Sequence, residues 1–146
     1  MAINSSPQWL PATVSNATTS SSDKTITIED NHLYQIMSIY VDYTTNATVG
    51  ARQLEVQLRD ESNNVLDFIL PGLTQAESLN YFYAFNLNHR DLTSLRDSDK
   101  VFTTMPFWVV NKRWNLRVFD NNAVDASGVG EDMIVRVTFM DRRIKI

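Results

Sequence analysis

The 146-residue sequence contains no cysteine, only four glycines and four prolines, and two histidines. Without cysteine the chain cannot form a disulfide, a thiolate zinc site or a cysteine nucleophile. The glycines form no G-x-x-x-x-G-K or G-x-G-x-x-G phosphate-binding loop, and the G-x-S-x-G nucleophile motif is missing. A chain of this length still buries roughly 68–70% of its unfolded surface, which is enough for one core without covalent links.

The sequence also lacks a basic excess and a long apolar run. The formal net charge is −4, from 13 basic and 17 acidic residues, whereas a nucleic-acid-binding protein normally carries a basic face. No segment approaches the ~20 apolar residues of a membrane-spanning helix, and the N-terminus lacks the pattern of a signal peptide. We therefore expect no nucleic-acid partner and no membrane partner, and synthesis in a cytoplasm.

What the sequence does contain is an alternation of apolar and polar residues. In the segment 52–59, Leu54, Val56 and Leu58 alternate with polar residues, as in a strand with one buried and one wet face. Similar β-prone segments, separated by turn-forming residues, are 25–28, 33–43, 65–70, 78–85, 107–110, 114–119 and 133–139. About eight strands at this spacing predict an all-β, antiparallel β-sandwich that is jelly-roll-like.

Residues 1–23 differ from the rest because Ser, Thr, Asn and Pro dominate them. We divide the chain into this polar, extended N-terminal arm and a single sandwich domain over residues 24–146. The arm nevertheless contains Trp9, Leu10 and Val14. Two interpretations stay open: an aromatic anchor that docks on a neighbouring subunit, or a loose terminus with an incidental tryptophan.

No residue pattern indicates catalysis or a resident cofactor. His32 and His89 lie far apart in turn-like contexts, outside any metal-binding motif. The segment between Asp120 and Asp132 is rich in oxygen ligands, but Val124 interrupts the calcium-loop pattern, and Asn and Asp also dominate ordinary turns. We expect a non-enzymatic protein without a cofactor, and an ion in this segment stays an open question.

Aromatic residues are numerous for a chain of this size. Those that stand out are Tyr34, Tyr40, Tyr43, Tyr81, Phe82, Tyr83, Phe107, Trp108 and Trp114. Their spacing along strands favours a core and an oligomer interface. The alternative is a carbohydrate-binding module that displays aromatics on its surface.

Two segments together resemble small virion proteins of tailed bacteriophages, and capsid cement (decoration) proteins are the most similar type. The first is 43–60, containing T-x-A-T-V-G-x-R-x-L, with Asn64–Leu66 after it, and the second runs from Trp114–Asp120 through Ala123–Asp125 to Glu131–Val137. The resemblance covers about half the chain and rests on turns and strands. It implies a non-enzymatic protein on the capsid surface of the virion, made in the cytoplasm of the host bacterium, that binds the major capsid protein and bridges capsid subunits.

We further expect a homo-oligomer, most simply a trimer, because many modest contacts add up to tight binding. The expected contact residues are Trp9, Leu10 and Val14 in the arm, His89 and Arg90 in the charged segment 86–100, and Arg142 and Arg143 in the basic C-terminal run. That run is alternatively a solvated strand end. Alternative functions are a phage neck or tail component, or the carbohydrate-binding module.

Overall fold

The structure is a computed structural model that describes residues 9–16, 23–87, 99–124 and 129–143. Within these ranges the chain forms ten strands and no helix, so no described helix could cross a membrane. The strands are β1 (Leu10–Asn16), β2 (Asp23–Thr27), β3 (His32–Thr44), β4 (Leu54–Arg59), β5 (Val65–Ile69), β6 (Asn80–Asn86), β7 (Lys100–Thr104), β8 (Val109–Val110), β9 (Asn115–Asp120) and β10 (Asp132–Arg143).

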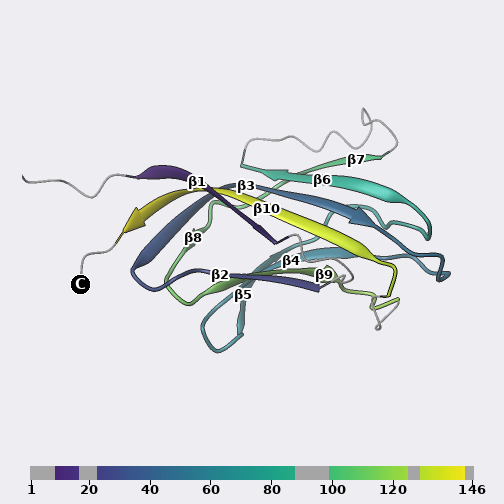
Figure 1. The fold of residues 1–146 in the computed structure, drawn as a ribbon, viewed down its shortest axis with the longest axis horizontal. Helices are drawn as coiled ribbons and strands as arrows, with labels where there is room; N and C mark the ends of the chain where they lie inside the picture. Colours follow the sequence, from purple (N-terminus) through teal and green to yellow (C-terminus); the bar gives the residue numbers. More distant parts are fainter. Residues whose placement is uncertain (1–8, 17–22, 88–98, 125–128, 144–146) are drawn as a thin grey trace, which may run out of the picture.

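The strands form two layers (Figure 1). The six-stranded sheet has the order β1-β10-β3-β6-β7, with β8 paired to β3, and the four-stranded sheet has the order β2-β9-β4-β5. Four of the antiparallel pairs are β1 with β10, β2 with β9, β3 with β6, and β4 with β5, and the antiparallel pairs β3 with β10 and β4 with β9 join them within each sheet. One long hairpin rolled across two sheets gives the first four pairs, which is the jelly-roll arrangement. The predicted β-sandwich is therefore confirmed.

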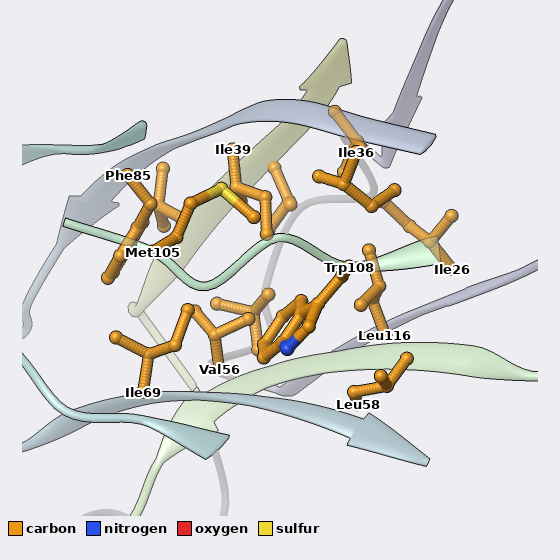
Figure 2. Packing of buried hydrophobic residues seen from close by; sticks show 14 of the residues in the cluster. Ile26, Ile36, Ile39, Val56, Leu58, Ile69, Phe85, Met105, Trp108 and Leu116 are labelled. Atoms are coloured by element: carbon orange, nitrogen blue, oxygen red, sulfur yellow. The ribbon is translucent and has the colours of Figure 1, made fainter. Parts of the chain in front are cut away.

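The core lies between the two sheets, where the apolar positions of both layers meet (Figure 2). Val56 and Leu58 of β4 point inward from one sheet, and Ile36 and Ile39 of β3 point inward from the other. Burying one such side chain contributes about 1.5–3 kcal/mol. This accumulated burial fixes which face of each strand points inward.

Strand β3 changes its alternation in the middle. Its partner β10 pairs Thr138 with Ser38 but Phe139 with Ile36, so Met37 is an extra, bulged residue. A bulge shifts the period-2 pattern by one position. For that reason Ile36 before the bulge and Ile39 after it both face the core.

The segment between β6 and β9 adds features that the sequence pattern did not predict. Strand β7 pairs parallel to β6, which requires a connection of a dozen or more residues, here 87–99. After β7 the chain passes between the two sheets, where Met105 and Trp108 are buried (Figure 2). The Trp108 indole Nε1 donates a hydrogen bond of 2.8 Å to Asp67 of β5, so this segment closes one side of the sandwich.

Candidate functional site

The outward face of the six-stranded sheet carries a hollow lined by aromatic rings. Tyr40 of β3 pairs with Ala84 of β6, and Ala84 pairs with Phe102 of β7, while Phe82 pairs with Lys100 in the next row. These five residues line a depression of about 240 Å³, which we call the aromatic hollow. The hollow exists because Ala84 places only a methyl group between larger neighbours on both sides.

Charged groups surround the Tyr40 side of the aromatic hollow. The Tyr40 and Phe82 ring centroids lie 6.2 Å apart with an interplanar angle of 24°, and the guanidinium carbon of Arg136 lies 5.7 Å from the Tyr40 centroid. Burial and the Asp42 carboxylate raise the pKa of Tyr40, against the opposing effect of Arg136 and Lys100. The phenol therefore stays protonated at neutral pH and can donate a hydrogen bond.

Asp42 is itself influenced by its position beside the hollow. Burial raises the pKa of the Asp42 carboxyl, the hydrogen bond with Asn80 lowers it, Asp132 raises it and Arg136 lowers it. The Tyr40 side of the hollow therefore combines the Asp42 carboxyl, the Asn80 amide, the Tyr40 phenol and the Arg136 guanidinium with apolar ring surfaces. Such a combination binds small ligands that have both apolar faces and polar edges.

The expected contact residues of the arm lie at one edge of the six-stranded sheet. Strand β1 pairs antiparallel with β10, and Val14 packs against this chain's own core. Leu10 keeps 60% of its surface exposed. Trp9 is half-buried, and the guanidinium carbon of Arg142 lies 6.0 Å from its ring centroid, within cation–π distance. The structure thus brings Trp9 and Arg142 together and assigns Val14 to the sandwich.

The other expected contact residues are not gathered at one place. His89 and Arg90 lie outside the described residues. Arg143 is exposed at the end of β10, where it pairs in register with His32. His32 Nδ1 lies 2.9 Å from Asp141, so this histidine ties the start of β3 to the end of β10.

The two segments that carry the phage-protein resemblance meet at a buried arginine. Arg52, fully buried before β4, uses its five N–H donors toward Glu131 and the 46–50 loop. Nε and Nη2 each lie 2.9 Å from Glu131 Oε1, Nη1 donates to the carbonyls of Thr48 and Gly50, and Nη2 also donates to Asn46. The pair therefore joins the β3–β4 loop to the residue that precedes β10.

Tyr43 and Gln75 extend this buried cluster. We call the four residues Arg52, Glu131, Tyr43 and Gln75 the arginine clamp. The Tyr43 hydroxyl donates to Glu131 Oε2 at 2.5 Å. Gln75 Nε2 donates to the Tyr43 carbonyl, and the Tyr83 hydroxyl donates to Gln75 Oε1. Burial and the Glu131 carboxylate raise the pKa of Tyr43 far above its ordinary value. Each partner is satisfied internally, so the arginine clamp is a structural feature.

Residues 120–124, the described start of the oxygen-rich segment, form a hydrogen-bonded turn. The carboxylate of buried Asp120 accepts backbone N–H hydrogen bonds from Gln53, Asn122 and Val124 at 2.9–3.0 Å. In the part of the chain that the structure describes, no group of three or more His, Asp or Glu side chains could hold a metal ion. The Asp120 carboxylate thus acts as a turn cap in this arrangement.

Strand β5 carries the most apolar outward row of the four-stranded sheet. Leu66 and Phe68 of β5 expose 47% and 56% of their surface, and Leu70, the residue after the strand, exposes 43%. The neighbouring outward positions of β4 are polar, and β5 is an edge strand. An exposed apolar row on an edge is a typical contact surface between proteins.

Comparison with known proteins found no matching family model and no matching curated protein. Among solved structures, an exo-β-agarase is similar at 12% identity, over 99% of this chain and 24% of that chain, with a TM-score of 0.34. A structure of infectious bursal disease virus Gx strain is similar at 11% identity, over 94% and 41% of the two chains, with a TM-score of 0.31. The chain spans less than half of either structure. TM-scores this low do not establish a shared fold, so the fold is assigned from the strand order alone.

In the sequence, Tyr40 and Phe82 stand out only as two of many aromatic residues. Ala84, Lys100 and Phe102 were missed, because the parallel pairing of β7 to β6 leaves no signal in the sequence. Arg52 did leave a signal. It has the same parity as Leu54 in the alternating segment, which places a charged side chain on the buried face.

Proposed function

We propose that this protein is a non-enzymatic virion structural protein of a tailed bacteriophage. It binds the major capsid protein at the capsid surface, bridges neighbouring subunits and acts as a homotrimer. Neither a nucleic acid nor a membrane is part of this function. The observation that supports it is the sequence resemblance in 43–60 and 114–137.

The structure adds a physical reason why these two segments would occur together. Arg52 of the first segment and Glu131 of the second form the buried ion pair of the arginine clamp. Gly50 of the first segment also lies against Val124 of the second. A β-carbon added at Gly50 would come within 2.6 Å of the Val124 side chain. These contacts give both segments a joint role in holding the sandwich together, which supports the proposal that they occur as a pair.

Two surfaces suit the bridging role. The outward row of β5 offers Leu66, Phe68 and Leu70 to a partner, and the edge strand β1 carries exposed Leu10 beside Trp9. Each surface consists of a few apolar residues, whereas a standard stable interface uses roughly 20–30 residues a side. Several copies held together by an oligomer would convert such modest contacts into tight binding.

A particle-binding experiment tests this proposal. Virions of the phage that encodes the chain are purified in a caesium gradient, and their proteins are identified by mass spectrometry and located by cryo-electron microscopy. We expect regularly spaced density on the capsid shell. Absence of the protein from purified virions would overturn the virion assignment, whereas density at the neck or tail would favour that alternative over the capsid.

Point variants then test the contact surfaces. Phe68→Lys and Trp9→Ala should each lower occupancy on capsids that lack the protein, while Thr27→Lys and Thr13→Ala, exposed positions on β2 and β1, should leave it unchanged. Truncation to Lys24 is a poor test, because it deletes β1 and leaves the β10 edge unpaired. Light scattering of the full chain checks the trimer, and a monomer at all concentrations would contradict it.

A further inference from the structure

The geometry of the aromatic hollow points to a saccharide-binding site, and we propose that it holds a pyranose ring between Tyr40, Phe82 and Phe102. This inference is independent of the capsid role. It rests on the hollow in the outward face of the six-stranded sheet, with Ala84 as its floor and three rings from three adjacent strands around it.

The apolar part of the site matches the C–H face of a sugar. The face of an aromatic ring is electron-rich, and the C–H bonds on one face of a pyranose are weakly positive. Tyr40 and Phe82 both line the hollow, so one ligand in it can contact both rings. Phe102 lies across Ala84 from Tyr40 and supplies the opposite wall.

The polar part of the site matches the hydroxyl edge of a sugar. Asp42 lies in register with Phe82 of the hollow, and the guanidinium carbon of Arg136 lies 5.7 Å from the Tyr40 ring centroid. Asp42 is hydrogen-bonded to Asn80, which orients its carboxyl. The Tyr40 hydroxyl and the Asp42 carboxyl are therefore near enough to the rings to pair with sugar hydroxyls, each of which both donates and accepts.

The size of the hollow favours a saccharide over a polypeptide partner. Its volume of about 240 Å³ lies below the roughly 300–1,000 Å³ of pockets for drug-sized ligands, which suits one or two sugar rings. A protein partner would in contrast bury a broad patch rather than one shallow hollow.

A binding experiment with defined saccharides tests the inference. The full-length protein is applied to a printed array of bacterial and plant glycans. Cellohexaose, a galacturonic acid hexamer and any array hit are then examined by saturation-transfer NMR and calorimetry. Tryptophan fluorescence is not a suitable measurement, because no tryptophan is among the residues that line the hollow. We expect binding, with saturation transfer to the ring C–H protons of the sugar.

Matched variants locate the binding. Ala84→Leu fills the hollow and Phe82→Ala removes a wall, and each should weaken binding at least tenfold. Thr138→Leu, at an exposed outward position on β10, should change nothing. Thermal melting identifies any variant that fails to fold. No saccharide bound on the array or in solution, or equal binding by Ala84→Leu, would overturn the proposal. Reduced capsid occupancy of Ala84→Leu without saccharide binding would assign the hollow to a protein contact instead.

Discussion

Replacement of Arg52 by methionine should strongly destabilise the fold. Methionine roughly fills the space of the arginine stem, but it removes all five donors of the arginine clamp. The Glu131 carboxylate, 1% exposed, would then stay buried, and among the described residues the Tyr43 hydroxyl would be its remaining side-chain donor. The Thr48 and Gly50 carbonyls would lose hydrogen bonds of 2.7 Å.

The magnitude follows from the burial of the pair. Removal of one partner from a buried ion pair typically costs about 3–5 kcal/mol, because the remaining charge is uncompensated. That is a large part of the roughly 5–15 kcal/mol stability of a typical domain. Glu131→Gln should cause a similar loss, since it leaves Arg52 charged and buried. The double variant should lose less unfolding free energy than the two single variants added together. The difference should be about 1–3 kcal/mol, because neither replaced residue leaves a buried charge.

Urea unfolding followed by circular dichroism measures these losses. The matched control is Arg113→Met, since the Arg113–Asp30 pair has a similar N–O distance of 2.8 Å but is 60% and 57% exposed, and exposed pairs contribute little. We expect no clear change in its urea midpoint. A loss below about 1 kcal/mol for Arg52→Met, or additive losses in the double variant, would refute the argument that the buried pair holds the loops together.

Three further outcomes follow from single positions. Gly50→Ala should lower stability by about 1–3 kcal/mol in urea unfolding, because a β-carbon would meet Val124 and the φ of +147° is one that glycine tolerates. Calcium or a chelator should leave the melting temperature unchanged, since backbone N–H groups already occupy the Asp120 carboxylate, and a calcium-dependent rise would contradict the turn-cap assignment. Asp42→Asn should stabilise the protein at pH 7. The raised pKa of Asp42 means that the folded state holds this proton more tightly than the unfolded state, so its ionisation destabilises the fold as pH rises. The gain should vanish near pH 3, where the carboxyl is protonated in both states, and an equal gain at both values would exclude ionisation as its cause.

Alternation was sufficient to predict most of the sandwich. Leu54, Val56 and Leu58 of β4, and Met133 and Val135 of β10, are buried as their period-2 spacing indicates. In β3 the Met37 bulge changes the phase of the alternation. Strand propensity cannot predict this bulge, because Met37 is an extra residue only relative to the partner strand β10. Strand β1 was missed within a polar segment, since its ordering depends on the existing edge of β10.

The sequence by itself determined that the chain is an all-β sandwich, because a side-chain period of two allows one buried face per strand. It also determined that cysteine chemistry and the common phosphate-loop and nucleophile motifs are excluded. The tertiary structure decided which residues became neighbours. Arg52 meets Glu131, and Ala84 lies between Tyr40 and Phe102. Such contacts depend on strand order and register, which arise from the packing of the whole core and leave no local pattern in the chain.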